Sequence, residues 1–309
     1  MKCAVLGAGG FIGINLCQAL LGRVDQLRAF NRTDRSIKEL AGLEWVLGDF
    51  DNPESVKEAV NGCDTVIHLI NTIPVHTKSG PIIDVQKNVV STLQLLDTCC
   101  EQGIKKIIFI SSGGSVYGIS DILPTPEYAA TEPITAYGVS KLTIEKYLAH
   151  YRHTKGLEYR ILRVANPYGP YQTISHNHGV IAVFIQRALM GLPIEIWGDG
   201  STIRDYIYIH DVVQAIIKVM DYEGPEHIFN IGSGKGLSLE QVVKAIEQKL
   251  KCLIEVKYTS QGSKHIPVSI LDIRKAGKYL EWKPQYSFDE GLSNTIDWLQ
   301  ERSENIPVI

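Results

Sequence analysis

The chain opens with Lys2-Cys-Ala-Val-Leu-Gly-Ala-Gly-Gly-Phe-Ile-Gly13, and this stretch decides the fold. A short apolar run ends at Gly7, Gly10 and Gly13 follow at three-residue spacing, and an amphipathic run continues from Ile14 to Leu21. This order predicts a strand, a tight turn and a helix. Glycines let such a turn approach a pyrophosphate closely, and the first N–H groups of the helix then face the phosphate oxygens. The stretch therefore predicts a dinucleotide site.

A signal peptide is the alternative interpretation, because Lys2 precedes the apolar stretch Cys3–Gly22. Asn15, Gln18 and the glycines interrupt that stretch, and no clear small-residue cleavage site follows it, which argues against the alternative. The six cysteines show no metal-ligand spacing. We expect a cytoplasmic protein whose cysteines are reduced core thiols.

Composition excludes several classes of protein. The 309 residues suffice for one large domain or two intimate ones. A net charge of −3 without a long Lys/Arg run argues against nucleic acid as a partner. No apolar run reaches the length of a membrane span. His176 and His178 lack a third ligand at zinc-site spacing, so we expect a polar loop near a substrate there, and no metal.

Strand-like and helix-like segments alternate through the first half of the chain. The predicted strands are Lys2–Leu6, Leu27–Asn31, Leu43–Leu47, Thr65–Leu69, Lys106–Ser111 and Arg160–Val164. The predicted helices between them are Ile14–Leu21, Glu54–Val60, Val85–Gln102 and Tyr137–His153. Such alternation is typical of an α/β fold with a parallel, doubly wound sheet and helices on both faces.

The pattern changes after Asn166, where Pro167, Gly169 and Pro170 break the regularity. Shorter elements are predicted at Val180–Met190, Ile194–Trp197, Asp205–Ile209, Val212–Met220, His227–Ile231 and Ser238–Leu250. We expect Asp211 to cap the helix that follows it. Because no linker separates the two halves, a smaller lobe should fold onto the first.

A second signal is Tyr137-Gly-Val-Ser-Lys141, which places a tyrosine and a lysine on one helix face. A free phenol, with a pKa near ~10, is a poor base at neutral pH. A neighbouring ammonium and a positive nicotinamide ring would stabilise the phenolate, which could then exchange a proton with a sugar or alcohol hydroxyl. The alternative is an ordinary amphipathic helix, because this spacing is short and common.

A third signal is Ile108–Gly118, a candidate buried strand that ends in small hydroxyl and glycine residues. Ligands of a parallel sheet bind beyond the carboxyl ends of its strands. We therefore expect Ser111, Ser112 and Ser115 beside a nicotinamide. The alternative is a polar turn.

The three signals, in this order and at these separations, resemble the short-chain dehydrogenase/reductase superfamily. Further stretches resemble its extended branch, the nucleotide-sugar epimerase/dehydratase family typified by UDP-galactose 4-epimerase. These stretches are Asn166–Gly169, Arg204–Ile207, Leu271–Ala276 and Leu280–Trp282. The resemblance covers essentially the whole chain. It implies a Rossmann sheet with a smaller mixed α/β C-terminal substrate lobe.

The resemblance also implies the lobes and the cofactor contacts. Residues 1–166, with a returning segment of about 205–235, would form the dinucleotide-binding domain, and residues 167–204 and 236–309 the sugar-nucleotide lobe. Tyr137 would be the acid/base and Lys141 its partner. The residues expected to contact NAD are Gly7, Gly10, Phe11, Ile12, Gly13, Asn31, Arg32, Asp49, Phe50, Leu69, Asn88, Ser111, Tyr137 and Lys141.

The chain departs from the family at the end of the second strand. The family usually places there an acid that bonds the adenosine ribose, and this chain has Asn31 followed by Arg32. An asparagine removes the charge that would repel a 2′-phosphate, and an arginine could attract one. NADP is therefore an alternative to NAD.

A second departure is Gly113, which stands where the family has its catalytic Ser or Thr. If strand alternation continues past the strand end, Ser111 and Ser115 point to the same side as position 113. Ser115 is then the first candidate for the missing catalytic hydroxyl, with Ser112 second and a water molecule third.

The substrate contacts implied by the resemblance are Asn166 and Arg204. Asn166 would hold the sugar-nucleotide phosphate, and Arg204 would clamp the diphosphate through its guanidinium. An internal ion pair with Asp205 or another acid is the alternative for Arg204. An arginine that the family has just before Pro267 is absent, and Lys264 is its candidate replacement.

The leading functional hypothesis is a nucleotide-sugar 4-epimerase, with a UDP-hexose as substrate and transient oxidation at C4. An NADPH-dependent nucleotide-4-ketosugar reductase and a non-catalytic dinucleotide-binding protein are the alternatives. A 4,6-dehydratase is disfavoured, because Gly114 and Ser115 replace the Asp-Glu pair which that chemistry needs.

The family often pairs two helices into a dimer interface. In this chain the corresponding helices are Val85–Gln102 and Tyr137–His153, with Leu95, Leu96, Tyr147 and Tyr151 as candidate contacts, so we expect a homodimer.

Overall fold

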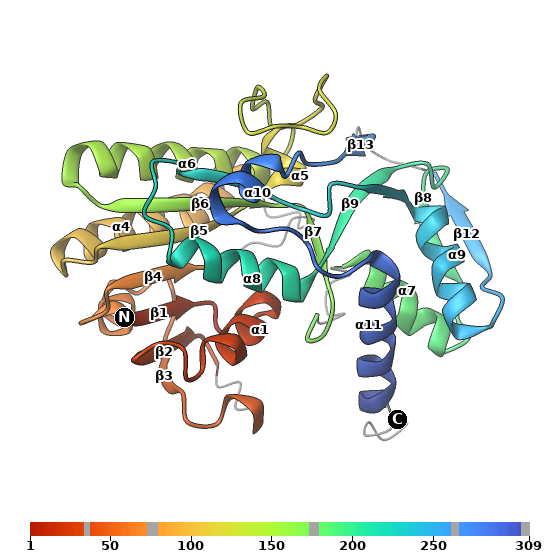
Figure 1. The fold of residues 1–309 in the computed structure, drawn as a ribbon, viewed down its shortest axis with the longest axis horizontal. Helices are drawn as coiled ribbons and strands as arrows, with labels where there is room; N and C mark the ends of the chain where they lie inside the picture. Colours follow the sequence, from red (N-terminus) through yellow and green to blue (C-terminus); the bar gives the residue numbers. More distant parts are fainter. Residues whose placement is uncertain (34–37, 73–79, 173–178, 261–265, 304–309) are drawn as a thin grey trace.

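The computed structural model describes residues 1–33, 38–72, 80–172, 179–260 and 266–303. Its centre is a seven-stranded sheet with the strand order β10-β6-β5-β4-β1-β2-β3, in which neighbouring strands run parallel (Figure 1). The strands are β1 (Lys2–Leu6), β2 (Gln26–Asn31), β3 (Glu44–Leu47), β4 (Thr65–His68), β5 (Lys106–Ser112), β6 (Glu158–Val164) and β10 (Ile228–Ile231). The predicted doubly wound, Rossmann-like α/β fold is confirmed.

Helices cover both faces of this sheet and form a separate core on each. Helices α1 (Phe11–Leu20) and α8 (Ile209–Met220) pack on one face. Helices α2 (Pro53–Val60), α4 (Ser91–Glu101) and α6 (Ala136–Lys155) pack on the other.

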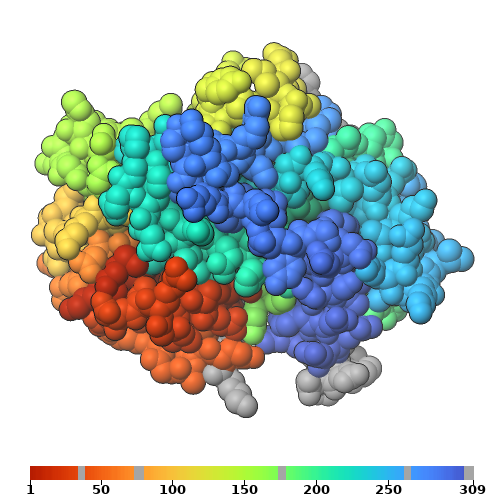
Figure 2. Space-filling model, in the orientation of Figure 1, coloured from red at the N-terminus to blue at the C-terminus, as the bar shows by residue number. Residues whose placement is uncertain are grey.

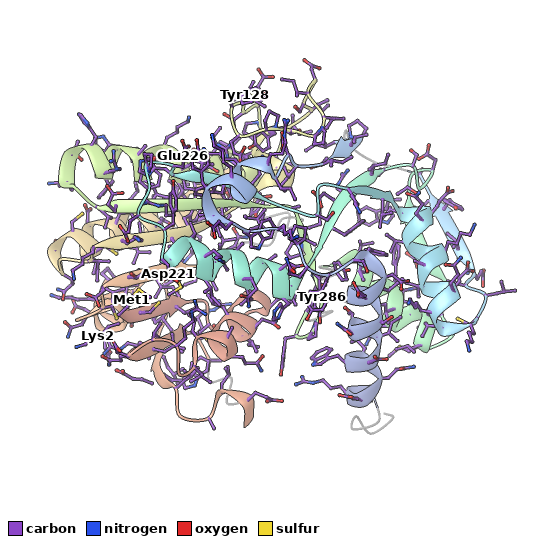
Figure 3. The ribbon with its side chains drawn as sticks, in the orientation of Figure 1. Met1, Lys2, Tyr128, Asp221, Glu226 and Tyr286 are labelled. Atoms are coloured by element: carbon purple, nitrogen blue, oxygen red, sulfur yellow. The ribbon has the colours of Figure 1, made fainter. Side chains whose placement is uncertain are left out.

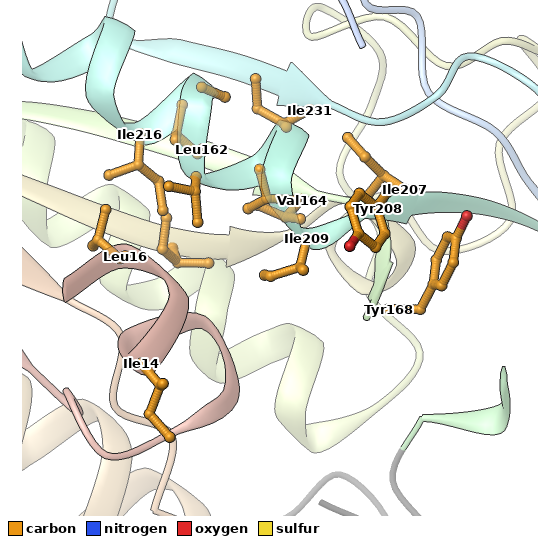
Figure 4. Packing of buried hydrophobic residues seen from close by; sticks show 14 of the residues in the cluster. Ile14, Leu16, Leu162, Val164, Tyr168, Ile207, Tyr208, Ile209, Ile216 and Ile231 are labelled. Carbon is orange, nitrogen blue, oxygen red and sulfur yellow. The ribbon is translucent and has the colours of Figure 1, made fainter. Parts of the chain in front are cut away.

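Strand β1 shows why both faces are buried. Cys3 and Val5 enter the core under α1 and α8, whereas Ala4 and Leu6 enter the opposite core. Side chains alternate between the faces of a strand, so a continuous apolar run suits a strand that is covered on both sides. Figure 4 shows part of the core under α1 and α8. This cluster extends from these two helices to strand β6 and to its neighbour β10. Each large side chain buried there contributes about 1.5–3 kcal/mol.

Beyond β6 the chain builds two smaller sheets. Strand β9 pairs with β7, β11 and β13, and β8 pairs with β12. Their bounds are β7 (Asn166–Tyr168), β8 (Ile194–Trp197), β9 (Ile203–Tyr208), β11 (Gly236–Ser238), β12 (Val256–Thr259) and β13 (Val268–Ser269). Strand β11 pairs antiparallel with β9, whereas β7 and β13 pair parallel with it. The proposed division into two lobes stays a prediction.

Four more helices complete the C-terminal half. They are α7 (Val180–Leu189), α9 (Leu239–Leu250), α10 (Arg274–Leu280) and α11 (Phe288–Ser303). Helix α8 contacts both α1 and α10, and Figure 2 shows the chain around α8 (teal) between the N-terminal part (red) and the C-terminal part (blue). The described helices include none with the length and apolar character that a membrane span requires.

Most predicted elements are confirmed, with ends shifted by three residues or fewer. The helix predicted over Val85–Gln102 is an exception. The chain instead forms α3 (Gly80–Asp84), a π-helical segment η2 (Val85–Val90) and then α4. The apolar spacing of this stretch predicted one continuous α-helix and did not reveal the π-helical turn.

The expectation that Asp211 caps a helix is wrong. Helix α8 already begins at Ile209, so Asp211 lies inside its first turn. The buried carboxylate accepts hydrogen bonds from the backbone N–H groups of Gln285, at 2.8 Å, and Tyr286, at 3.2 Å. Asp211 therefore fixes the segment before α11 rather than the start of α8 (Tyr286 is labelled in Figure 3).

The glycine turn after β1 is as tight as its sequence predicts. Gly7 has a φ of +89°, and its carbonyl accepts a hydrogen bond from the N–H of Gly10 at 3.0 Å. A Cβ atom on Gly13 would lie 2.2 Å from the carbonyl oxygen of Gly7, which is backbone and cannot move aside. The start of α1 can pack on the turn only because position 13 carries no side chain.

We expect Gly13→Ala to lower the free energy of unfolding by about 2–3 kcal/mol, because the added methyl group overpacks a rigid contact. Gly277→Ala is the matched control, since a Cβ there meets only the carbonyl oxygen of Trp282 at 3.7 Å and the residue lies within α10. Urea unfolding followed by circular dichroism measures both. A Gly13→Ala protein as stable as its parent would contradict this packing.

Candidate functional site

A cavity of about 260 Å³ lies at the carboxyl ends of β1, β2 and β4. Of the residues predicted to contact a cofactor, it is lined by Gly7, Gly10, Asn31, Arg32, Asp49, Phe50 and Leu69. Phe30, Ile70, Asn71 and Thr72 complete the lining. A larger groove of about 760 Å³ lies beside the edge strand β10, near Tyr128 and Glu226 (Figure 3), and contains none of the predicted site residues. We place the site at the smaller cavity because the glycine turn and the strand ends meet there.

The start of α1 fits a pyrophosphate. Gly10 occupies the N-cap position without a side chain that could cap the helix, and it lines the cavity. The first N–H groups of α1 therefore remain for an anion. Phe11, Ile12 and Gly13 form the first turn of α1 but do not line the cavity.

The adenosine end of the cavity lacks an acid at the end of β2, as the sequence shows. The side-chain amide of Asn31 donates a hydrogen bond to the carbonyl of Thr33 at 2.7 Å. Arg32 is exposed at the rim of the cavity. The amide of Asn31 and the cation of Arg32 thus lie where the family resemblance would place the adenosine ribose or a 2′-phosphate.

Aromatic rings form an apolar floor next to this cavity. The ring of His68 lies 5.2 Å from the Phe50 ring and 5.4 Å from the Phe109 ring. Burial, together with the nearby charge of Lys141, lowers the pKa of His68 to about 3, so this imidazole is neutral at neutral pH. A ring nitrogen of His68 pairs with the hydroxyl of Thr92 at 3.0 Å.

Helix α6 brings Tyr137 and Lys141 to the end of strand β5. The helix is capped by Thr135, whose hydroxyl accepts the N–H of Gly138 at 3.1 Å, so both residues lie in its first two turns. The Lys141 ammonium is buried and donates a hydrogen bond to the carbonyl of Ile110 at 2.9 Å. It lies 5.7 Å from the centre of the Tyr137 ring. The predicted pair is therefore assembled on one helix face.

Burial dominates the acidity of both side chains. It raises the pKa of Tyr137 to about 12; a hydrogen bond with Ser112 opposes this shift and the charge of Asp84 adds to it. Burial lowers the pKa of Lys141 to about 8, against the charges of Asp84 and Glu145. Tyr137 is therefore a neutral phenol in the ligand-free protein, because desolvation disfavours the phenolate. The expected stabilisation of the phenolate by Lys141 together with a positive nicotinamide ring stays a prediction.

Strand alternation does not extend to Ser115, the first candidate for the missing hydroxyl, so the premise of that expectation is wrong. Strand β5 ends at Ser112, and α5 (Gly113–Val116) follows directly. Ser112 lies close enough to the Tyr137 phenol for its side chain to lower the pKa of Tyr137. A Cβ on Gly113 would lie 2.5 Å from Cδ1 of Leu271, which fills the space of a larger residue.

Ser111 and Asn88 have internal partners. The Ser111 hydroxyl is buried and donates to Glu145 at 2.5 Å, on the side of the sheet that faces α6. The side-chain oxygen of Asn88 accepts the N–H of Thr72 at 2.8 Å, so Asn88 holds the wall of the cavity rather than lining it. Ser111 and Asn88 therefore hold neighbouring elements in place and do not line the cavity themselves.

The candidate substrate residues lie on neighbouring strands β7 and β9. The amide of Asn166 donates to the backbone carbonyl of Asp205 at 3.0 Å, and the Arg204 guanidinium donates to the carbonyl of Ile203 at 2.8 Å. The alternative that Arg204 pairs with Asp205 is wrong, because the buried Asp205 carboxylate accepts N–H groups from Ser233, Gly234 and Leu271 instead. Lys264, His176 and His178 lie outside the described residues.

Tyr206 is a candidate that the sequence analysis missed. It follows Arg204 by two residues on β9, so both side chains leave the same face of the strand, and it pairs in register with Asn166. Its phenol oxygen is buried and has no hydrogen-bond partner among the described residues. The Arg-x-Tyr spacing in a strand was the available signal. No group of three or more potential metal ligands occurs in the described part of the chain.

Comparisons with known proteins agree with this geometry. The model of the NAD-dependent epimerase/dehydratase family matches residues 3–232. A dTDP-4-dehydro-6-deoxyglucose reductase of Escherichia coli is 35% identical and shares 94% of this chain and 95% of its own length. A putative UDP-glucose 4-epimerase of Methanocaldococcus jannaschii is 32% identical over 96% and 97% of the two chains.

Solved structures extend the similarity to three dimensions. A UDP-glucose 4-epimerase of Thermotoga maritima, determined with UDP-glucose, has a TM-score of 0.93 and 32% identity over 98% of this chain and 100% of its own. A Thermus thermophilus UDP-glucose 4-epimerase, determined with NAD, has a TM-score of 0.89 and 29% identity over 97% and 99%. The match of the family model over most of the chain, together with these relatives, shows that the protein belongs to the NAD-dependent epimerase/dehydratase family.

Proposed function

We propose that the protein is an NAD-dependent nucleotide-sugar 4-epimerase with a UDP-hexose as substrate. The observation that carries this proposal is the cluster of Tyr137, Lys141 and Ser112 at the carboxyl end of β5. These residues do not line the cavity, but in the sheet only β4 separates β5 from β1, whose carboxyl end leads into the glycine turn. The named 4-epimerases among the relatives support it.

NAD fits the residues of the cavity. The glycines leave room for the pyrophosphate, the uncapped start of α1 offers N–H groups, and Leu69 and Phe50 offer apolar contact. When bound, NAD supplies a reversible two-electron acceptor for C4 of the sugar.

The chain's own residues move the proton. Tyr137 would take the proton of the 4-hydroxyl group during oxidation. It would return the proton after the 4-keto sugar has rotated in the site and presents its other face. Ser112 would hold the phenol and the sugar oxygen in line. The pKa of Tyr137 is about 12 in the ligand-free protein, so the phenol is not yet an effective base. A positive nicotinamide ring beside it, in addition to the Lys141 ammonium, would be needed to stabilise the phenolate.

The substrate side would be held by β7 and β9. Arg204 lacks a carboxylate partner among the described ion pairs, and Tyr206 offers an unpaired phenol on the same strand face. A diphosphate suits both, because guanidinium and hydroxyl donors pair with phosphate oxygens. Asn166, on the neighbouring strand, would complete this set of donors.

A nucleotide-4-ketosugar reductase is the second candidate. Arg32 at the rim of the cavity and the uncharged Asn31 would admit a 2′-phosphate, and a protonated Tyr137 is ready to donate a proton to a ketone. The Escherichia coli relative has a reductase name. A non-catalytic dinucleotide-binding protein is less well supported, because Tyr137, Lys141 and Ser112 lie together at the end of β5.

One assay separates the three candidates. The purified protein is incubated with UDP-glucose or UDP-galactose, and separately with NADPH or NADH and a dTDP-4-keto-6-deoxyhexose. Interconversion of the UDP-hexoses supports the epimerase. Reduction of the ketosugar without interconversion favours the reductase. Tight dinucleotide binding without either reaction would reject both enzymes.

We expect Ser112→Ala to lower kcat on the order of a hundredfold, the usual scale for a group in proton transfer, and Tyr137→Phe to abolish turnover while dinucleotide affinity persists. Ser115→Ala is the control and should stay within a few-fold of the parent. Steady-state kinetics and calorimetric titration with NAD measure these effects. A large loss in Ser115→Ala with none in Ser112→Ala would reverse the assignment.

We also infer a homodimer formed through the outer faces of α4 and α6, in a cytoplasmic protein whose six cysteines are unpaired. Leu95 and Leu96, named as contacts from the sequence, are fully buried in the core and cannot take part. Val139 and Tyr147 on α6 are 46% and 39% exposed, and Val90 at the start of α4 is 43% exposed. These exposed apolar residues could pack against α4 and α6 of a second copy of the chain.

Light scattering tests the dimer. The parent should have twice the chain mass of 34.3 kDa, and Tyr147→Glu should have the monomer mass, because a charge would be buried at the interface. Leu253→Glu, at a position 97% exposed outside both helices, is the control and should remain dimeric. A parent protein of monomer mass at assay concentration would refute the dimer.

A further inference from the structure

We propose that Asp84 is a positioning residue for the Tyr137–Lys141 pair: its carboxylate ties helix α6 to the wall of the dinucleotide cavity and supplies the negative charge that both side chains face. The expected effect on the pH dependence of kcat rests on the function proposed above. The contacts of Asp84 and its effect on the titration of Tyr137 do not.

Asp84 uses both carboxylate oxygens. It ends helix α3 and is 4% exposed. One oxygen accepts a hydrogen bond from the hydroxyl of Ser140, and the other accepts one from the side-chain amide of Asn88 at 2.9 Å. Ser140 is buried and lies on α6 directly before Lys141. Asp84 therefore holds the turn of α6 that carries the catalytic pair.

The connection continues to the cavity. Asn88 lies in the π-helical segment η2, and its side-chain oxygen accepts the backbone N–H of Thr72 at 2.8 Å. Thr72 lines the cavity. Three hydrogen bonds thus link Ser140, through Asp84 and Asn88, to the wall against which a dinucleotide would lie. π-Helical turns are often retained at functional sites, and here the turn holds the middle of this connection.

Among the described residues, Asp84 forms no ion pair within 4.0 Å, although its charge acts on the ammonium of Lys141. Its two hydrogen-bond donors are neutral. Glu145, the second acid that acts on Lys141, is paired with Arg163 at 2.6 Å and also accepts the hydroxyl of Ser111. A buried carboxylate is costly unless an opposite charge or strong hydrogen bonds stabilise it.

The groups that face the catalytic pair can be named element by element. Asp84 comes from α3, Glu145 from α6 with its partner Arg163 on β6, and His68 from β4. His68 is neutral, because burial lowers its pKa to about 3. With Glu145 engaged by Arg163, Asp84 is the acid in this set that acts on both Tyr137 and Lys141.

The sign of the effect follows from the charges. A negative charge nearby raises the pKa of a phenol and the pKa of an ammonium alike. Asp84 therefore adds to the effect of burial on the pKa of Tyr137, and it keeps Lys141 charged to a higher pH. A neutral residue at position 84 should lower both pKa values, so that the phenolate of Tyr137 forms at a lower pH.

Two variants separate charge from geometry. Asp84→Asn removes the charge but can keep both hydrogen bonds, since its oxygen can accept from Asn88 and its amide can donate to the Ser140 hydroxyl. Ser140→Ala removes one hydrogen bond and keeps the charge. Glu101→Gln, which neutralises an exposed acid at the end of α4, controls for net charge.

The first readout needs no turnover. Absorbance at 295 nm of the ligand-free protein follows tyrosinate, and subtracting the matching Tyr137→Phe protein isolates Tyr137. We expect Asp84→Asn to raise the Tyr137 phenolate fraction at pH 10 by tenfold or more, which corresponds to about one pKa unit. Ser140→Ala and Glu101→Gln should match the parent within twofold.

The second readout is the pH dependence of kcat. We expect its rising limb to move to lower pH by about one unit in Asp84→Asn. Ser140→Ala should weaken dinucleotide binding or lower kcat without moving the limb. If Asp84→Asn does not fold, Asp84→Ser is a second neutral variant for both readouts.

The outcomes are distinct. An unchanged Tyr137 titration in a folded neutral variant would overturn the proposal, even if that variant were less stable, because only a structural role would remain. Failure to act on any sugar nucleotide would reject the proposed function but leave the titration interpretable. A shifted titration in Glu101→Gln would also overturn the proposal, since the effect would then come from net charge.

Discussion

The structure depends on one buried ammonium. Lys141 lies under the carboxyl end of β5, bonded to the carbonyl of Ile110 and set over the ring of Phe109 at 4.6 Å. A charge in this position requires a continuous set of partners, because water cannot solvate it. The strand end, helix α6 and the acids around it are arranged to provide these partners. The position of Tyr137 follows from that arrangement, since it lies one helical turn away.

The requirement to stabilise this ammonium connects the fold to the chemistry. The seven-stranded sheet brings the ends of β1, β4 and β5 side by side, so the glycine turn and the catalytic pair open on the same edge. The helices on each face bury the strands and hold these ends in register. Burial then makes the tyrosine a weak acid and the lysine a weak base. The ligand-free site thus holds a neutral phenol beside a charged amine at neutral pH.

Much of this could be predicted from the sequence, for physical reasons that apply locally. Three glycines at fixed spacing permit only a close turn, and Gly13 indeed has no room for a Cβ atom. Tyr137 and Lys141 share a face because helical spacing requires it. The interactions that were missed are those between distant segments. Asp84 meets Ser140 across 56 residues, and no local pattern announces that contact.

The errors have the same origin. Ser115 was placed by strand alternation, but the strand ends at Ser112, where two glycines allow a helical turn to begin. Arg204 had a plausible neighbour in Asp205, yet that carboxylate is occupied by backbone N–H groups from a different part of the chain. Sequence spacing identifies which residues can meet. Tertiary packing decides which of them do.

The central claim is that Lys141 is a desolvated ammonium inside the fold. The most direct measurement is an NMR pH titration of the ligand-free protein labelled with ¹³C at lysine Cε, with the Lys141 signal assigned by a Lys141→Arg variant. We expect a midpoint of about 8 for Lys141, while solvent-exposed lysines should titrate near the ordinary value of 10.5. A Lys141 midpoint at the ordinary value would show that its side chain is solvated, and the account of the site would fail.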